Sequence, residues 1–271
     1  MRLSDTLILI RGGGDLATGV AHRLHRAGFS LLITELPQPL CVRRAVSFAE
    51  AVYAGGERIA VEGVIARLAP DPAAGMTYTT LNEIPVLVDE GKATLEQLRP
   101  SIVIDARLAK NKLDTTISDA PLVIALGPGY VAGKDCHAIV ETQRGHNLGR
   151  VYWQGSAESD TGQPEPVQGF AGQRVLRAPC EGTFNGELEI GELVRAGKVV
   201  ARVNGEPIVA QFDGVVRGLL HDGLRVSAGL KVGDLDPRGV REHCFLISDK
   251  ARAIGGGVLE AIFAGRRLWM P

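Results

Sequence analysis

The sequence has little of what would direct a chain to nucleic acid, to a membrane or to an oxidising compartment. The formal net charge of its 271 residues is −1, which gives no field to attract nucleic acid or an anionic lipid surface. No apolar run approaches the roughly 20 residues of a membrane span, and Leu7–Ile10 is far too short for a signal peptide. The four cysteines are widely spaced and form no C-x-x-C pair. Reduced thiols and a cytoplasmic location are therefore expected.

The stretch from Leu7 to Glu35 has the order strand, glycine turn, helix and second strand. Leu7–Ile10 is a short apolar run of β-forming residues, typical of a strand that is buried on both faces. Apolar residues then recur every four positions, as in an amphipathic helix, until Gly28 provides a left-handed C-terminal cap. Ser30–Thr34 predicts the second strand, and Glu35 ends it.

Three glycines follow the first strand. Gly12, Gly14 and Ala17 have the spacing G-x-G-x-x-A, which is close to the dinucleotide-binding fingerprint. Glycine lets backbone N–H groups approach a pyrophosphate, and the start of the helix supplies partial positive charge. Glu35 follows the glycines by about twenty residues, where a carboxylate would hydrogen-bond a ribose. The pattern predicts a bound nucleotide or pterin-like ligand. The alternative is a glycine-rich turn that packs helix on strand and binds nothing.

Asp15 complicates this prediction, because an acid at a helix start can cap the N–H groups itself and repel phosphate. The run Gly12–Asp15 nevertheless resembles the GGGD-x-A of the pyridine-nucleotide site in thioredoxin reductases and of siroheme-forming dehydrogenases. An aspartate is therefore compatible with a ligand. The predicted ligand-binding residues of this stretch are Gly12, Gly13, Gly14, Asp15, Leu16 and Glu35.

Two further buried strands are predicted, at Ser101–Asp105 and Leu122–Leu126. Ligands of open parallel sheets bind beyond the carboxyl ends of the strands. The residues that follow these two strands are therefore candidates for the rim of the same site, the alternative being a solvated charged loop. They are Asp105, Arg107, Lys110, Lys112, Gly127, Gly129 and Tyr130.

The segment between the second strand and Ser101 is predicted to hold two helices, the shorter at Leu95–Leu98, and two strands. The apolar residues of 42–53 recur at helical spacing, which predicts a helix. Arg43 and Arg44 at the start of this helix could bind a phosphate, or they could be solvated. Ile59–Leu68 and Ile84–Asp89 predict strands, with a proline- and glycine-containing loop between them.

Residues 136–146 include Cys136, His137, Glu141 and His146, but the spacing of these side chains matches no zinc pattern. No metal is therefore predicted. Glu141 or His146 could serve as a base, yet spacing alone pairs neither with a nucleophile. The alternative is a tight turn in which these side chains bond the backbone.

Beyond a polar, glycine- and proline-rich linker at 156–173, one pattern occurs twice, with a shift of 32 positions between Ala178 and Ala210. Both copies contain G-x-x-V-x-x-G, which resembles biotinyl and lipoyl carrier domains. Such domains present a modified lysine on the hairpin that joins their halves. The corresponding turn here, Val203–Pro207, contains no lysine, so neither biotin nor lipoate is expected. A repeat of short strands with glycine corners predicts a small closed barrel used for packing or docking.

The tail predicts a helix that begins at Ser248-Asp249. Its three consecutive glycines, Gly255–Gly257, each cost a helix roughly 1 kcal/mol relative to alanine. They are expected to admit a closely packed backbone, either within the chain or across a subunit interface.

Four long motifs, at 12–24, 34–55, 125–155 and 248–262, resemble the accessory proteins of the selenium-dependent molybdenum hydroxylase system, the YqeB-type family. The N-terminal half is also similar, more distantly, to the Rossmann domain of xanthine dehydrogenase accessory proteins, which handle the molybdenum cofactor. The resemblance implies a maturation factor that docks on a molybdenum hydroxylase apo-enzyme and binds a small-molecule cofactor.

The expected architecture is α/β. A Rossmann-like parallel-sheet domain at 1–165 precedes a barrel-sandwich domain with an internal two-fold repeat at 173–237 and a C-terminal helical segment at 238–271. Candidate cofactors are NAD(P), ATP and the molybdopterin cofactor. The alternative functions are an NAD(P)-dependent oxidoreductase and a non-catalytic docking protein, so whether a reaction is catalysed stays open. A homo-oligomer is possible, and no nucleic acid or membrane partner is expected.

Overall fold

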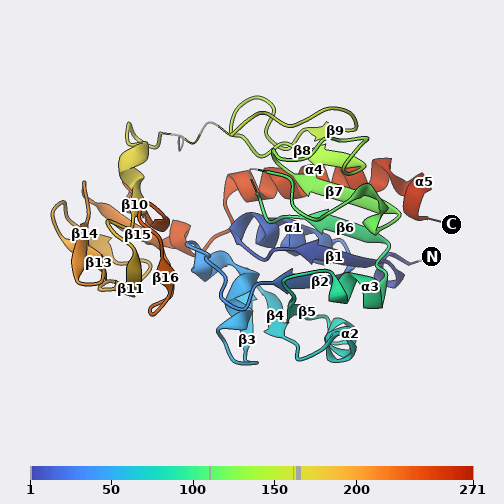
Figure 1. Ribbon diagram of the computed structural model, residues 1–271, viewed down its shortest axis with the longest axis horizontal. Helices are drawn as coiled ribbons and strands as arrows, with labels where there is room; N and C mark the ends of the chain where they lie inside the picture. The colour runs from blue at the N-terminus through green and yellow to red at the C-terminus, as the bar shows by residue number, and fades with distance from the viewer. Residues whose placement is uncertain (1, 110, 161, 163–165, 271) are drawn as a thin grey trace. The chain divides into compact units, whose positions relative to one another are not determined.

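The computed structural model describes residues 2–109, 111–160, 162 and 166–270, which divide into two compact units (Figure 1). Unit 1 takes the described residues of 1–39, 48–160 and 247–271, and unit 2 those of 40–47 and 161–246. The expected C-terminal segment 238–271 is thus divided, because residues as far as Leu246 belong to unit 2 and the helix that follows belongs to unit 1. Within the described ranges, no helix is long and apolar enough to cross a membrane.

Unit 1 is built on one nine-stranded sheet with the order β3-β4-β5-β2-β1-β6-β7-β8-β9. The strands from β4 to β8 run parallel, whereas β3 and β9 pair antiparallel at the two edges. The expectation of a parallel Rossmann-like sheet is corrected accordingly, since the sheet is mixed. The strands are β1 (Leu7–Arg11), β2 (Ser30–Glu35), β3 (Arg58–Val61), β4 (Val64–Leu68), β5 (Ile84–Val88), β6 (Ile102–Asp105), β7 (Leu122–Leu126), β8 (Ala138–Val140) and β9 (Val151–Tyr152).

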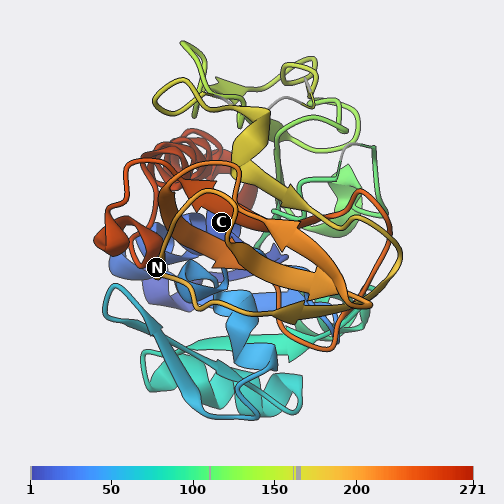
Figure 2. The same cartoon turned by 90° about the vertical axis from the view of Figure 1, so that its left-hand side faces the viewer.

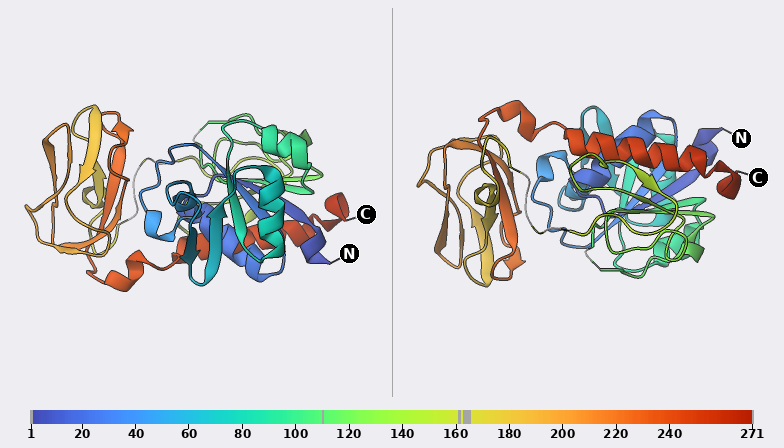
Figure 3. Two further views of the ribbon diagram at one scale, coloured as in Figure 1. Left: turned by 90° about the horizontal axis from the view of Figure 1, so that it is seen from below. Right: turned by 90° about the horizontal axis from the view of Figure 1, so that it is seen from above.

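Helices cover both faces of this sheet. Leu9, Leu32 and Val103 share a core cluster against which Tyr78 and Leu98 pack, from the second and third helices. Side chains alternate along a strand, so the neighbours of Leu9 in β1 point to the other face. The first and fourth helices pack on each other, and the fourth also contacts β7 and β8 (Figure 3). The helices are α1 (Asp15–Arg26), α2 (Pro72–Thr80), α3 (Ala93–Leu98), α4 (Asp249–Ala264) and α5 (Arg266–Trp269).

Short 3₁₀ helices replace the helix that was expected over 42–53. That expectation was wrong because Ala49 donates its N–H to the carbonyl of Gly13, a tertiary bond that competes with a continuous helix. The loop expected between the two strands also holds a helix, α2, which Asp71 caps and Pro72 begins. The 3₁₀ helices are η1 (Leu3–Asp5), η2 (Arg44–Val46), η3 (Phe48–Val52), η4 (Ile117–Asp119), η5 (Gly172–Arg174) and η6 (Arg241–Cys244).

The glycines of α4 allow the close backbone packing that the sequence predicts, within unit 1. A Cβ built on Gly255 would lie 2.9 Å from the carbonyl oxygen of Gly19 in α1. A Cβ on Gly257 would lie 2.1 Å from the carbonyl oxygen of Gly149, in the loop before β9. Ser248 caps the helix as expected, its Oγ accepting from the N–H of Ala251 at 3.2 Å.

Unit 2 consists of two four-stranded antiparallel sheets, β10-β17-β15-β12 and β14-β13-β11-β16 (Figure 2). The 32-residue shift relates the strands themselves, because β11 begins at Gly182 and β15 at Gly214. Each sheet takes two strands from each copy of the repeat, so the copies interlock. The strands are β10 (Val175–Arg177), β11 (Gly182–Gly186), β12 (Leu193–Val194), β13 (Val199–Val203), β14 (Glu206–Val209), β15 (Gly214–Leu219), β16 (Arg225–Val226) and β17 (Lys231–Asp236).

Equivalent glycines make equivalent bonds between the two copies. Gly191 donates its N–H to the carbonyl of Val216, and Gly223 donates to that of Phe184, both at 2.8 Å. The φ angles of these two glycines, +95° and +81°, are in the left-handed region that favours glycine. The repeated glycines therefore mark corners at which one copy is bonded to the other.

Candidate functional site

The three glycines of the turn after β1 have different surroundings. A Cβ on Gly12, whose φ is +94°, would lie 3.2 Å from the carbonyl oxygen of Ala106, and one on Gly13 would lie 3.0 Å from the nitrogen of Ala49. Packing against backbone thus explains the first two glycines. A Cβ on Gly14 would meet no atom of the described residues within 4 Å. Gly14 is the N-cap of α1, and as a glycine it has no side chain with which to cap the helix.

Glu35 lies beside the glycine turn, as the spacing predicts. Its Oε1 accepts a hydrogen bond from the N–H of Gly13 at 2.6 Å, and its Oε2 accepts one from the N–H of Leu36 at 2.8 Å. Burial raises the pKa of the Glu35 carboxyl above its ordinary value, and the two backbone N–H groups act in the opposite direction. The end of β2 therefore holds a carboxylate in a fixed orientation next to the start of α1.

Asp105 ends β6 and is the centre of a buried polar network. It accepts hydrogen bonds from the side chains of Arg107, Thr115 (2.6 Å) and Tyr130 (2.7 Å), and only 2% of it is exposed. Burial alone would raise the pKa of Asp105, but the hydrogen bonds and charge of Arg107, with the two hydroxyls, hold it below its ordinary value. Burial, and next the hydrogen bond to Asp105, raise the pKa of Tyr130 to about 12.

Two arginines and two aspartates compensate one another in this network. Arg11, at the end of β1, is 3% exposed and donates to Thr115 (2.7 Å) and to Asp114 (2.8 Å). Arg107 pairs with Asp114 at 2.7 Å as well as with Asp105. The predicted rim residues Asp105 and Arg107 are thus together, but bonded to each other rather than open to an anion. Sequence reasoning missed Arg11, Asp114 and Thr115. The signal for Arg11 was an arginine at the end of an otherwise apolar strand.

The remaining candidates of the rim pack against backbone or lie apart from the turn. Gly127 and Gly129 have φ angles of +72° and +103°, and a Cβ on Gly129 would lie 2.8 Å from the carbonyl oxygen of Ala109. Lys112 pairs with Asp135 at 2.6 Å. Leu16 is buried, Asp15 is half-buried in the first turn of α1, and Lys110 lies outside the described residues.

The cysteine- and histidine-containing segment around β8 closes turns. Glu141 accepts from the N–H groups of Thr142 and Gln143, both at 2.7 Å, and from that of Glu158 at 2.8 Å. The Nδ1 of His137 accepts from the N–H of Val123 at 3.0 Å. Across the described part of the chain, no group of three or more His, Cys, Asp or Glu side chains is arranged to hold a metal ion. The geometry favours the tight-turn interpretation of this segment.

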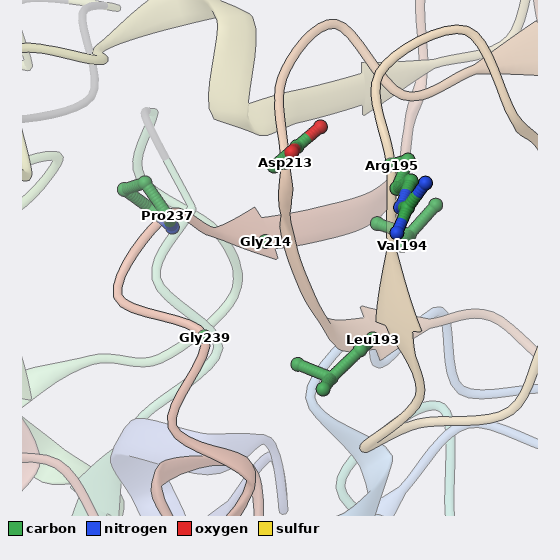
Figure 4. Close-up of a pocket in the computed structure, with 7 residues that line it drawn as sticks. All are labelled: Leu193, Val194, Arg195, Asp213, Gly214, Pro237 and Gly239. Atoms are coloured by element: carbon green, nitrogen blue, oxygen red, sulfur yellow. The ribbon is translucent and has the colours of Figure 1, made fainter.

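Arg43 and Arg44 both belong to unit 2. Arg43 donates to the carbonyls of His243 and Leu246 at 3.2 and 3.1 Å, and Arg44 donates to that of Leu219 at 3.1 Å. A groove of about 460 Å³ also lies on unit 2, between Leu193 of β12 with the adjacent Arg195 on one side and Asp213 and Pro237 on the other (Figure 4). None of the predicted ligand-binding residues lines it.

No protein-family model matches this chain. A curated protein is similar to nearly the whole of it. The chain is 49% identical over 256 residues to the uncharacterized protein YqeB of Escherichia coli K12, a match that covers 94% of this chain. The chain spans about half the length of this relative, because the match covers 47% of YqeB. The identity supports the YqeB-type resemblance, whereas a link to selenium-dependent molybdenum hydroxylases is not shown.

Solved structures are only remotely similar. An aspartoacylase family protein from Mesorhizobium loti is 13% identical, with a TM-score of 0.26 over 85% of this chain and 84% of the other. A succinylglutamate desuccinylase/aspartoacylase from Rhodobacter sphaeroides is 14% identical, with a TM-score of 0.27 and the same coverage. TcdA (CsdL) is 12% identical, with a TM-score of 0.29 over 98% and 89% of the two chains. Likenesses this weak carry no argument about chemistry.

These comparisons correct two predictions. The solved structures just named are two proteins of aspartoacylase and desuccinylase type and TcdA, and none is a molybdenum hydroxylase factor or a biotinyl or lipoyl carrier. Neither the match to YqeB nor these structures support the predictions of a molybdenum hydroxylase maturation factor and of a Rossmann domain joined to a biotinyl- or lipoyl-like barrel-sandwich, and both are withdrawn. What is shown is that the chain is a homologue of the YqeB-named protein, along about half of that protein's length.

Proposed function

We propose that unit 1 binds a nucleotide, with phosphate oxygens at the start of α1 and ribose hydroxyls at Glu35. The observation that carries this proposal is the open space at Gly14, directly beside a carboxylate that is fixed on the N–H of Gly13. Packing explains Gly12 and Gly13, but no atom of the described residues lies close enough to require a glycine at position 14. A ligand that approaches the backbone there would require it.

The start of α1 suits an anion, because the first N–H groups of a helix have no partner within the helix and carry partial positive charge. Gly14 has no side chain that could occupy them. Asp15 adds a negative charge in the first turn. That charge favours NAD, whose phosphates form a bridged diphosphate, over the more highly charged NADP and ATP.

Glu35 suits a ribose. Each oxygen of its carboxylate accepts one N–H and can accept one further hydrogen bond, as two neighbouring hydroxyls would provide. Apolar side chains lie next to it: Leu36 follows in the chain and Val88 is its register partner in β5, and these are 48% and 47% exposed. A base could pack on them. The molybdopterin cofactor, the other candidate, has a phosphate but no ribose diol, so it would leave Glu35 without a role.

Isothermal titration calorimetry of the full chain with NAD, NADP and ATP tests the proposal. Gly14→Val and Glu35→Gln should each weaken binding about tenfold or more, because the first blocks the approach of phosphate and the second removes an ionic acceptor. Folding should survive Gly14→Val, since φ is −62° and the added Cβ meets open space. Glu57→Gln, an exposed glutamate of unit 1, is the matched charge control. Wild-type affinity in both site variants would refute the site.

A further inference from the structure

Unit 1 has an exposed surface at the C-terminal ends of α1 and α4 that neither the sequence patterns nor the proposed nucleotide site explains. Phe29, just after α1, donates its N–H back to the carbonyl of Leu24 at 3.2 Å. Its ring centre lies 6.2 Å from that of Phe263 in α4 and 6.3 Å from that of Trp269 in α5, the short helix that follows α4 (Figure 1). These aromatic contacts join the two helix ends into one surface.

Large apolar side chains of this surface are exposed to water. Phe263, Leu268 and Met270 are 42%, 46% and 41% exposed. They belong to one helical corner, because α5 folds back on α4, with the indole N–H of Trp269 donating to the carbonyl of Ile262 at 2.9 Å. A single exposed apolar side chain is ordinary, whereas several at one corner indicate an interaction site.

Four arginines accompany these apolar side chains. They are Arg23 and Arg26, in the last turn of α1, and Arg266 and Arg267, at the start of α5. In the part of the chain that the structure describes, none of the four forms an ion pair. Glu260 is the only acid of residues 23–29 and 256–270. This surface therefore has an excess of three positive charges.

Helix electrostatics accounts for part of this arrangement. Basic side chains near the end of a helix interact favourably with its partial negative charge. Arg266 does so directly, since its Nη1 donates to the carbonyl of Phe263 at 3.2 Å. The effect does not explain why Phe263, Leu268 and Met270 are exposed among the arginines. Contact with a partner would remove these apolar side chains from water.

We propose that this surface binds an acidic surface of another protein, one with an apolar centre. Protein interfaces are enriched in arginine, methionine and aromatic residues and depleted in lysine, and the cations of this surface are all arginines. The excess of positive charge selects an acidic partner. A second copy of the chain, docked about a two-fold axis, would place the same arginines against one another and be repelled. We call this surface the arginine-rich patch; its members are Arg23, Arg26, Phe263, Arg266, Arg267 and Leu268.

The arginine-rich patch and the proposed nucleotide site lie at opposite ends of α1. This helix runs from Asp15 to Arg26, which is roughly 18 Å at 1.5 Å per residue. A protein bound at the patch therefore leaves Gly14 and Glu35 open, so partner and nucleotide can bind at the same time.

Photo-crosslinking in the organism's own cells tests this proposal. The full chain carries p-benzoylphenylalanine in place of Leu268 or, as a control, in place of Leu113, which is 42% exposed in the loop after β6. Position 268 should give about tenfold more protein adduct than position 113, and the double variant Arg266→Gln, Arg267→Gln should abolish the difference. Arg99→Gln, Arg150→Gln is the matched control, because both are exposed arginines of unit 1.

The crosslinked protein is then identified by mass spectrometry, purified and titrated calorimetrically with the full chain. Its affinity should fall about tenfold or more in the Arg266→Gln, Arg267→Gln variant, and it should also fall as salt screens the opposite charges. Equal melting temperatures of wild type and variant establish that the variant folds. Equal adduct at positions 268 and 113, adducts of lipid or nucleic acid in place of protein, or an affinity that neither salt nor the variant lowers would overturn the proposal.

Discussion

The glycine run of α4 allows a test in which neighbouring substitutions have opposite effects. A Cβ on Gly257 would lie 2.1 Å from the carbonyl oxygen of Gly149 and 2.8 Å from Cγ1 of Val140. Ordinary contacts begin at 3.4 Å, so the backbone of the loop before β9 would have to move by more than an ångström. At Gly256, the nearest atom is the end of the flexible Arg23 side chain, at 3.9 Å. The two substitutions to alanine therefore differ only in what the new methyl group meets.

The magnitudes follow from two opposing terms. Alanine in place of glycine stabilises a helix interior by about 1 kcal/mol. Overpacking costs about 1–3 kcal/mol, and the upper value applies at Gly257 because the obstacle is backbone. Gly256→Ala should thus raise the free energy of unfolding by about 1 kcal/mol, and Gly257→Ala should lower it by about 2 kcal/mol. At about 2–4 °C per kcal/mol, the melting temperatures shift by about +2 to +4 °C and −4 to −8 °C.

Differential scanning calorimetry of the full chain measures these shifts, and amide hydrogen exchange in α4 assigns the transition to unit 1. Two-state analysis is not needed, because the comparison rests on the order of the melting temperatures. If Gly257→Ala melts at or above Gly256→Ala, the packing of α4 on the 149 loop is not as described.

Three further expectations concern other parts of the chain. An ultraviolet pH titration should show one of the four tyrosines ionising at about 12, the value for Tyr130, and Tyr130→Phe should abolish that step and lower the free energy of unfolding by about 1–2 kcal/mol. Although burial opposes it, Arg238 lowers the pKa of Asp236 to about 2, so this carboxylate stabilises unit 2 fully above its ordinary pKa of about 4 and loses that effect as the pH falls towards 2. In Arg238→Gln, the Asp236 titration followed by NMR should move to higher pH, and an unchanged titration would contradict the pairing. Intact-mass measurement should find neither biotin nor lipoate, since the turn at 203–207 has no lysine.

Local patterns predicted local structure well where tertiary contacts agreed with them. The order from β1 to β2 follows the expected residues, because apolar runs, the glycine turn and Gly28 all favour the same elements. The segment 42–53 shows the opposite case. Its helical spacing does bury Phe48 and Ala49, but the bond from Ala49 to Gly13 and the hydroxyl of Thr18 on the N–H of Phe48 favour 3₁₀ turns.

The site was predictable only in part, for the same reason. Strand ends and the rule for parallel sheets placed Glu35 and Asp105 at one edge of the sheet. Whether a charged side chain there is open or bonded depends on residues far along the chain. Arg11 donates a hydrogen bond to Asp114, which lies 103 positions further along the chain, and no spacing rule predicts such a pair. An arginine at the rim is consequently weak evidence for an anion site until its acceptors are known.

Arg107 shows why the acceptors of a charged side chain decide whether it can bind a ligand. In sequence, its position in the loop after a buried strand suits an anion-binding residue. In the fold, Arg107 has acceptors on Asp105, Asp114 and Thr115, so its charge is compensated within the protein. An anion at this position would have to displace those acceptors, and leaving the buried carboxylate of Asp105 without its partner would cost free energy that the anion does not return.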